Sequence, residues 1–312
     1  MSDDTAPGQG PKHDKAHEDL HGPGSSPHSG LDAKRACLEH TLKDLGKCVI
    51  AFSGGVDSSL LLAAAVRQLD ERARAIVMHP PYVPARELEE ARELADELGV
   101  QYEIIDMDMP GELGDNPERR CYLCKLKLFR KIGERARAAG IQAVLDGSNA
   151  DDGQAYRPGM QALAEMGVRS PLAECGFTKA DVRELSRSWG LPTWDKPAYS
   201  CLLTRLPHGS PVDIGLLERV ETAERVLTEE GFPAVRVRTY RTGTGDLARI
   251  EVPPEQRKRF FSTGMMDRID ARLRETGYRY VTLDLAGYRS GSMDPQQKNH
   301  RSENDTTGGQ QA

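Results

Sequence analysis

The sequence predicts an α/β protein in which a Rossmann-like parallel sheet, covered by helices on both faces, is followed by a smaller α+β domain. Three observations support this. Short apolar segments alternate with helical segments in the first part of the 312-residue chain. The first apolar segment runs directly into a glycine-rich turn and then a helix. After about Arg205 the order of the elements changes. We therefore expect two domains, at residues 31–205 and 206–292.

The elements of the first domain follow from their apolar spacing. Short apolar runs predict buried strands at residues 48–52 and 75–78, and further strands are expected at residues 100–106 and 143–146. Helical spacing predicts one helix before the first strand and three helices between the strands, at residues 31–46, 58–69, 85–98 and 123–139. Gly99 and Gly140 end the last two of these helices. Strands that alternate with helices indicate βαβ units and hence a parallel sheet.

The second domain is predicted to have the order α-β-β-α-β. A helix is expected first, then two strands around a Thr-Gly-Thr-Gly turn, then a long helix and a last strand, at residues 213–230, 235–240, 248–252, 254–276 and 280–285. The boundary between the domains is placed near Leu206-Pro207-His208-Gly209, where proline and glycine interrupt the helical pattern.

Composition limits the class of protein. The net charge is −6, which argues against a large nucleic-acid surface. No apolar run reaches the roughly 18 residues that a membrane span needs, and the first residues lack the apolar core of a secretory signal. A cytoplasmic protein is expected, in which six cysteines do not form a disulfide framework. Residues 1–30 and 293–312 are expected to be disordered tails, and His13, His17, His21 and His28 to be solvated.

The turn after the first strand has the features of a phosphate-binding loop. Two glycines let the backbone turn tightly and direct successive N–H groups into one space, and the following helix adds the positive end of its dipole. Hydroxyl groups add donors, and Asp57 can cap the helix or help to hold Mg²⁺. The residues expected to bind are Ser53, Gly54, Gly55, Asp57, Ser58 and Ser59. A capped strand-to-helix turn without a ligand is the alternative.

This string resembles the PP-loop of the adenine-nucleotide α-hydrolase superfamily, whose members cleave ATP between the α and β phosphates. It is not a Walker A loop, because no Gly-Lys-Ser/Thr follows. The resemblance implies that backbone groups of Met78, at the end of the second strand, contact the adenine. It also implies that Asp146 and Gly147, at the end of the fourth strand, face the nucleotide or its Mg²⁺. An acidic surface turn is the alternative for these carboxylates.

Three cysteines have a spacing that suits a metal centre. Cys121 and Cys124 form a CxxC at the start of a predicted helix, whose N-terminus lowers thiol pKa values. With the distant Cys201 they would supply three ligands of a [4Fe–4S] cluster. Zinc, a redox pair and unconnected thiols are the alternatives. Cys37, Cys48 and Cys175 lie on apolar stretches and are expected to be core residues.

The whole of residues 31–292 resembles the LarE family, ATP-dependent sulfur transferases of nickel-pincer nucleotide cofactor synthesis. The resemblance rests on several blocks in one order, at residues 52–59, 120–125, 146–152, 156–159, 196–205, 236–238, 245–251 and 285–292. It implies that the substrate is pyridinium-3,5-dicarboxylate mononucleotide, whose carboxylate is adenylated and then converted to a thiocarboxylate. It also implies a role in maturing a lactate racemase, and a homo-oligomer.

The resemblance leaves two sources for the sulfur. Cys201 matches the catalytic cysteine that gives up its own sulfur in single-cysteine members, and Asp57 belongs to the activating half of the site. The presence of Cys121 and Cys124 resembles the members that hold a [4Fe–4S] cluster on three cysteines, which we favour. The sequence does not reveal which partner resupplies the sulfur.

Three arginines are expected to bind the substrate, because a planar guanidinium suits both phosphate and carboxylate. They are Arg205, Arg236 and Arg238. An exposed pair of strand arginines on one face is the alternative for the last two.

Three other functions compete with sulfur transfer to a nucleotide. A tRNA 2-thiolation enzyme uses the same loop, but its usual basic or zinc-ribbon module is not found in the sequence. An ammonia-dependent synthetase needs no cysteine triad. The third alternative is a non-enzymatic iron–sulfur or zinc module that senses ATP.

Overall fold

The computed structural model describes residues 27–154, 158–197, 200–289 and 292–293. The predicted tails fall almost wholly outside these residues, as do the tail histidines His13, His17 and His21. The described part begins with helix α1 (Pro27–Leu45), which starts four residues before the predicted helix. Among the described residues, no helix is both long and apolar enough to cross a membrane.

The first domain is built on a four-stranded parallel sheet, as the sequence predicts. Its strands are β1 (Cys48–Ala51), β2 (Ala73–His79), β3 (Gln101–Asp106) and β4 (Val144–Leu145). Their order is β3-β2-β1-β4, and every neighbouring pair is parallel. The chain therefore moves outward from β1 to β3 and then crosses back to the other side of β1. This reversal makes the carboxyl ends of β1 and β4 the expected ligand site.

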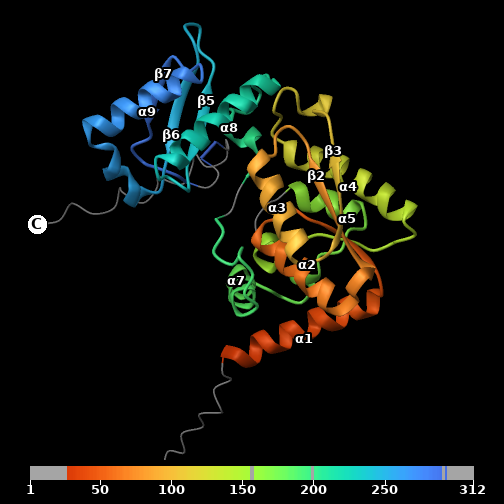
Figure 1. Cartoon of the computed structure of the whole chain (residues 1–312). Coiled ribbons are helices and arrows are strands. Elements are labelled where there is room, and N and C mark those ends of the chain that lie inside the picture. The colour runs from red at the N-terminus through yellow and green to blue at the C-terminus, as the bar shows by residue number, and fades with distance from the viewer. Residues whose placement is uncertain (1–26, 155–157, 198–199, 290–291, 294–312) are drawn as a thin grey trace, which may run out of the picture.

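Helices cover both faces of this sheet (Figure 1). Alternate residues of β1 enter different cores: Cys48 and Ile50 pack on one side, and Val49 on the other. The first core is closed by α1, α2 (Val56–Leu69), α3 (Ala85–Glu97), α6 (Pro171–Glu174) and α7 (Lys179–Ser188). The second is closed by α4 (Arg120–Ala138) and α5 (Pro158–Glu165). Short 3-10 helices join these elements at Asp70–Arg72, Gly111–Leu113 and Ala150–Gln154.

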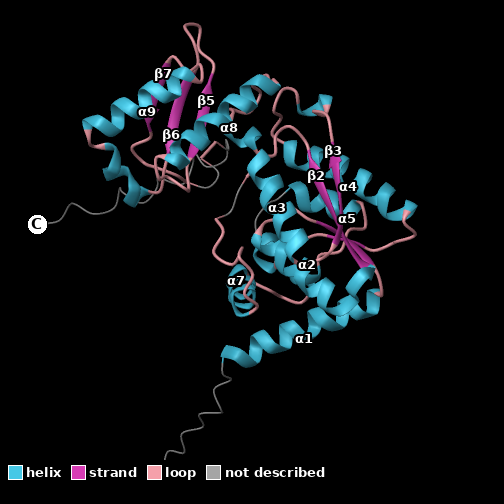
Figure 2. Ribbon diagram, in the orientation of Figure 1, coloured by secondary structure: helices cyan, strands magenta, loops and turns pink. Residues whose placement is uncertain are grey.

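The second domain has the predicted α-β-β-α-β order (Figure 2). It consists of α8 (Ile214–Glu229), β5 (Arg236–Tyr240), β6 (Leu247–Glu251), α9 (Thr263–Glu275) and β7 (Tyr280–Leu283). Strand β6 is central, antiparallel to β5 and parallel to β7. The prediction of one helix over residues 254–276 was wrong. A 3-10 helix, Pro254–Phe260, is followed by a separate α9 that begins after Ser262.

A third apolar core lies where the two domains meet. The short helix η4 (Leu202–Arg205) follows Cys201 and buries Leu202 and Leu203 against α8 and Tyr82. Cys124 and Cys201 pack against this same core. The junction of the domains therefore holds two of the three cysteines that the sequence selected.

The expectation for the other cysteines is partly wrong. Cys48 is a buried free thiol, as expected. Cys175 is buried in the core as expected, but Cys37 is exposed, and the two form a disulfide between α1 and the residue after α6. Their separation of 138 residues explains why spacing gave no hint of the pair, since only the packing of α1 onto α6 brings the two side chains together.

Candidate functional site

The phosphate loop leaves β1 at the point where the chain reverses across the sheet. Gly54 has φ +66°, a conformation that glycine adopts without cost. A Cβ atom on Gly54 would lie 3.0 Å from Cβ of Ala91 in α3. The loop therefore lies directly against α3, and both its conformation and this contact explain the glycine.

The serines of the loop are organised around Ser58. Its Oγ donates to the carbonyl oxygen of Gly55 at 3.2 Å and lies 3.1 Å from Oγ of Ser53. Ser53 is exposed and Ser58 is buried, and both line the cavity described below. Ser59 is fully buried, and its Oγ has no hydrogen-bond partner among the described residues. Ser53 and Ser58 are thus better placed for a ligand than Ser59.

Asp57 is held between two side chains from distant parts of the chain. Nδ2 of Asn149 donates to its Oδ1 at 3.0 Å, and Nζ of Lys179 lies 2.5 Å from its Oδ2. Lys179 is the first residue of α7, so its ammonium group reaches the first turn of α2. The ammonium group of Lys179 thus lies where a metal cation bound to the Asp57 carboxylate would lie. The motif indicated Asp57, but nothing in the sequence indicated Lys179.

A cavity of about 320 Å³ opens beside the loop at the carboxyl ends of the strands. Its lining includes polar residues of the loop, Ser53, Gly55 and Ser58. It also includes apolar residues, with Met78 near the end of β2 and Leu128, Phe129 and Ile132 from α4. A lining with both polar and apolar parts suits a nucleotide. Met78 lines this cavity, and its contact with the adenine stays a prediction.

Asp146 and Gly147 also line this cavity, and Gly147 packs directly against the start of α2. A Cβ atom on Gly147 would lie 2.7 Å from the backbone nitrogen of Ser58, so only glycine permits this approach to α2. Asp146 is buried and accepts hydrogen bonds from Oγ of Ser148 at 2.6 Å and from Oγ of Ser170 at 2.5 Å. Nζ of Lys125 lies 3.6 Å from its Oδ2. The surface-turn alternative therefore does not hold for Asp146.

The three thiols come from two segments that meet at the domain junction. Cys121 is exposed on the first turn of α4, and Cys124 lies half-buried one turn later. Cys201 directly precedes η4. The hydroxyl of Tyr82 lies 3.1 Å from Sγ of Cys124. In the described part of the chain, no three His, Cys, Asp or Glu side chains converge closely enough to hold a single metal ion.

The thiols influence one another's protonation. The pKa of Cys124 is raised to about 12, mainly by burial and also by the neighbouring Cys201 and Cys121, while the hydrogen bond with Tyr82 acts in the opposite direction. Burial, followed by the charge of Cys121, also raises the pKa of Cys201. Without a cation, both groups are therefore neutral thiols at pH 7. The thiols therefore oppose one another's ionisation.

Asn116 joins the two cysteine segments. Its side chain is fully buried, and its Nδ2 donates to the carbonyl oxygens of Leu203, Leu206 and Pro207 at 3.0–3.1 Å. It lies four residues before the start of α4, which carries Cys121 and Cys124. One amide thus fixes the segment after Cys201 to the approach to α4. The sequence gave no signal for this residue.

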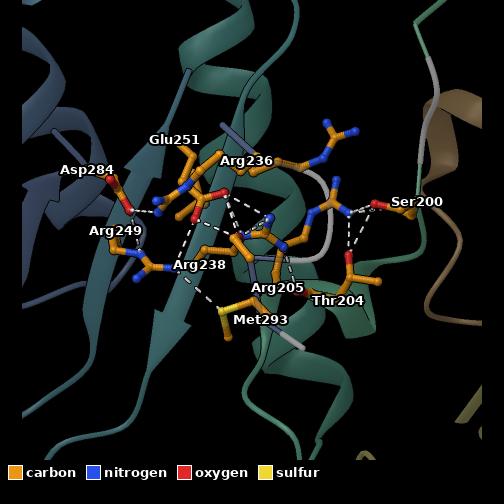
Figure 3. A network of polar contacts seen from close by, with 12 residues as sticks. Ser200, Thr204, Arg205, Arg236, Arg238, Arg249, Glu251, Asp284 and Met293 are labelled. Atoms are coloured by element: carbon orange, nitrogen blue, oxygen red, sulfur yellow. Dashed lines mark hydrogen bonds and ion pairs between the residues drawn. The ribbon is translucent and has the colours of Figure 1, made fainter. Parts of the chain in front are cut away.

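Arg236 and Arg238 are both buried, so the alternative of an exposed pair of strand arginines is wrong, and Arg205 is buried as well (Figure 3). Arg205 forms a bidentate pair with Glu224, at 2.8 and 2.9 Å. Arg238 donates through Nε to the fully buried Glu251 at 2.9 Å and through Nη1 to the carbonyl oxygen of Thr204 at 2.7 Å. These two arginines lock η4 onto the second domain.

Arg236 lines a second cavity, of about 220 Å³, together with Arg205. The cavity lies between the first turn of α3, η4, α8 and β5. Burial and the neighbouring Arg205 lower the pKa of Arg236, which means that positive charges crowd here. Glu87, Glu221, Glu224 and Glu229 line the same cavity, so its lining carries charges of both signs. Arg238 does not line this cavity, so the two strand arginines differ in position: Arg236 lies at the cavity and Arg238 does not.

The fold and the loop together define an α/β nucleotide-binding protein of the PP-loop type, and comparisons with known proteins agree. Residues 34–119 match the NAD synthase family. The chain is 41% identical over 266 residues to an uncharacterized protein of Synechocystis sp., covering 84% of this chain and 97% of the relative.

Two further relatives extend over most of the chain. The chain is 38% identical over 266 residues to the pyridinium-3,5-bisthiocarboxylic acid mononucleotide synthase of Lactiplantibacillus plantarum, covering 84% of this chain and 94% of the relative. It is 30% identical over 244 residues to an uncharacterized protein of Methanocaldococcus jannaschii, covering 78% and 91%. The chain belongs to the LarE family of pyridinium-3,5-bisthiocarboxylic acid mononucleotide synthases.

Proposed function

We propose that this chain uses ATP to convert a carboxylate of pyridinium-3,5-dicarboxylate mononucleotide to a thiocarboxylate. The synthase of Lactiplantibacillus plantarum, named for the bisthiocarboxylic acid mononucleotide that it makes, supports this proposal. Further support comes from a cavity beside the phosphate loop, a second cavity lined by Arg205 and Arg236, and the packing of Cys124 and Cys201 at the junction of the domains.

The reaction has two steps whose atoms balance. A substrate carboxylate oxygen attacks the α phosphorus of ATP, the bond to the β phosphate breaks, and pyrophosphate leaves. The product is an acyl-adenylate. A sulfur nucleophile then attacks the acyl carbon, and AMP leaves with the electrons of the broken C–O bond. The first step is required because a free carboxylate is a poor electrophile.

The first cavity suits the activation step. Backbone N–H groups of the loop and the hydroxyls of Ser53 and Ser58 would hold the pyrophosphate, with the dipole of α2 behind them. Asp57 would exchange the ammonium group of Lys179 for Mg²⁺ when the metal arrives with ATP. Lys179 would then be released toward the phosphates. The apolar part of the lining, with Met78, would receive the adenine.

The second cavity suits the substrate anion. Arg205 and Arg236 would face the phosphate or a carboxylate of the mononucleotide. Arg238 would act indirectly, because Glu251 and Thr204 already occupy its guanidinium group.

The sulfur step belongs to Cys201, by one of two routes. A [4Fe–4S] cluster on Cys121, Cys124 and Cys201 would supply sulfide as the sulfur source. We favour this route because the three thiols form one interacting group in which positive charge is needed to ionise them. In the other route Cys201 gives up its own sulfur and becomes dehydroalanine.

One contact carries the proposal more than any other. Nζ of Lys196, five residues before Cys201, donates to the carbonyl oxygen of Gly54 at 2.8 Å. This hydrogen bond joins the phosphate loop to the segment that leads to Cys201. A transfer in two steps within one site requires these two segments to lie close together.

The test is turnover of the purified protein with ATP, Mg²⁺ and pyridinium-3,5-dicarboxylate mononucleotide under anaerobic conditions. We expect substrate-dependent pyrophosphate release and a product about 16 Da heavier for each oxygen replaced by sulfur. Pyrophosphate release with ammonia instead, undiminished when all three cysteines are alanine, would overturn the proposal in favour of a synthetase. Thiolation of added tRNA, or no pyrophosphate with any carboxylate, would overturn it as well.

We also propose a homo-oligomer. Large apolar side chains are exposed on the second domain, including Phe261 at 73% and Leu285 at 76%. Association of copies would cover such surface. Light scattering of the full chain measures the oligomeric state, and a monomer at micromolar concentration would contradict the proposal. The product would serve a nickel-pincer enzyme of the lactate racemase kind.

A further inference from the structure

One carboxyl group, that of Glu87, lies between the two cavities of the site. It belongs to the first turn of α3, two residues after the helix begins. Glu87 lines the nucleotide cavity and also the arginine-lined cavity, and no other described residue lines both. A substrate anion in the second cavity that reacts with ATP in the first must therefore pass or contact this side chain.

The cations near Glu87 are already engaged by other carboxylates. Lys196 lies 2.5 Å from Oε2 of Glu90, and Arg205 forms its bidentate pair with Glu224. Burial is the largest influence on Glu87 and raises its pKa to about 7, against the attraction of Lys196, Arg205 and Arg86. A large fraction of Glu87 is thus protonated at neutral pH.

Other charged groups also face the two cavities. From α8 and β5 they are Glu221, Glu224, Arg225, Glu229 and Arg236, and around the nucleotide they are Asp57, Lys125, Asp146 and Asp152. Both ligands of these cavities are anions under the proposed function. An ionised Glu87 would repel them, whereas a protonated one supplies an O–H donor.

We propose that Glu87, in its protonated form, donates a hydrogen bond to the substrate carboxylate that is to be adenylated and holds it beside the α phosphorus of ATP. This inference rests on the proposed function and assigns a substrate-binding residue to it. No proton is consumed, because the other oxygen of the carboxylate attacks phosphorus while the hydrogen-bonded oxygen becomes the carbonyl of the acyl-adenylate. The negative charge of the bound substrate would raise the proton affinity of Glu87 further, which would strengthen the hydrogen bond between Glu87 and the substrate carboxylate.

The experiment measures substrate-dependent pyrophosphate release between pH 6 and 9, a step that does not need sulfur. The variants are Glu87→Gln, which keeps a neutral donor, and Glu87→Ala, which removes it. Glu93→Gln, an exposed acid on the same helix, is the matched control. Binding of a non-hydrolysable ATP analogue, measured by calorimetry, reports whether each variant keeps its nucleotide cavity.

In the wild-type enzyme we expect kcat/KM for the dicarboxylate to fall as the pH rises through about 7, because Glu87 loses its proton. Glu87→Gln should stay within a few-fold of wild type at pH 6.5 and should lack this fall. Glu87→Ala should raise KM for the dicarboxylate about tenfold or more while leaving the affinity for the ATP analogue unchanged. Glu93→Gln should follow the wild-type profile.

Two results would overturn the inference while leaving the proposed function intact. One is a Glu87→Gln variant that keeps the wild-type fall in kcat/KM. The other is a Glu87→Ala variant whose KM for the dicarboxylate equals that of wild type. If wild-type protein releases no pyrophosphate with the dicarboxylate at any pH, the proposed function itself fails, so the two failures are distinguishable.

Discussion

Nζ of Lys196 donates a 2.8 Å hydrogen bond to the carbonyl oxygen of Gly54 and lies 2.5 Å from Oε2 of Glu90. The side chain is only 11% exposed, so these contacts are shielded from water. Gly54 also touches α3, the helix of Glu90. Lys196 therefore fixes three parts of the site at once: the phosphate loop, α3 and the segment leading to Cys201.

Replacement of Lys196 by alanine should loosen the phosphate loop. We expect KM for ATP to rise and kcat/KM for pyrophosphate release to fall about tenfold or more, because a charge-assisted hydrogen bond is lost. The formation of thiocarboxylate should fall at least as much. Lys131→Ala, on the exposed face of α4, is the control and should behave as wild type. Unchanged ATP kinetics in Lys196→Ala would show that the contact has no part in positioning the loop.

Replacement of Asp57 by asparagine should abolish pyrophosphate release. The amide cannot replace a carboxylate as a Mg²⁺ ligand, and the ammonium group of Lys179 loses its ion pair.

Ser58→Ala should likewise abolish pyrophosphate release, because Ser58 Oγ holds the loop at Gly55 and Ser53. The measurement is pyrophosphate release over a range of Mg²⁺ concentrations. Asp57→Asn activity that recovers fully at high Mg²⁺ would mean that Asp57 only sets the affinity for the metal.

The three thiols should be needed together for iron. Anaerobic reconstitution should give about four irons per chain with the visible absorption of a cluster. Alanine at Cys121, Cys124 and Cys201 should remove them, whereas alanine at Cys37 and Cys175 should not. Iron that persists in the triple variant refutes the cluster.

The intact mass of the protein after turnover distinguishes the two sulfur sources. Loss of one H₂S, about 34 Da, at Cys201 means that this residue gives up its own sulfur, whereas an unchanged mass means that the cluster delivers it.

The metal-free thiols should differ in their reaction with iodoacetamide. Only the thiolate reacts, and the pKa of Cys124 is raised to about 12, so very little of it is ionised at pH 8. We expect exposed Cys121 to be modified first and Cys124 to react more than about a hundredfold more slowly than cysteine in an unfolded peptide. The rate at Cys124 should rise about tenfold per pH unit up to its pKa. Peptide mass spectrometry of timed samples measures this, and equal rates at both positions would contradict the buried position of Cys124.

Glu251 should be important for stability. It is fully buried and pairs with Arg238 and Arg249, at 2.8 and 2.9 Å. Glu251→Gln leaves buried positive charge without compensation and should lower the free energy of unfolding by about 3–5 kcal/mol. Adding Arg238→Met to this variant should restore part of the loss, as urea unfolding can show. A loss below about 1 kcal/mol would mean that water reaches these arginines.

The fold was largely predictable because its signals are local. The four strands of the parallel sheet and the α-β-β-α-β order of the second domain follow from the apolar pattern, and the phosphate loop follows from its motif. The order of the strands was not predicted, because pairing is a long-range property. The helices α5, α6 and α7 were not predicted either. The predicted helix over residues 254–276 is interrupted between Phe260 and Thr263, where the sequence pattern gave no clear stop.

The site was predictable only where a motif marks it. Gly147 was predicted from the sequence block at residues 146–152. The structure shows why a glycine is needed there, because its backbone lies directly against Ser58. Lys179, Glu87, Tyr82 and Asn116 belong to no motif that signals their roles. The strand arginine Arg238 could be read as exposed because the carboxylate that pairs with it, Glu251, comes from another strand. Such partners become visible only after folding.

The disulfide between Cys37 and Cys175 encloses a particular part of the chain. All four strands of the nucleotide-binding sheet, the phosphate loop and the CxxC helix lie between these two residues. In the oxidised protein they form one covalent ring. A protease that cuts once within this ring therefore separates no fragment, and both pieces travel together on a non-reducing gel until the disulfide is reduced.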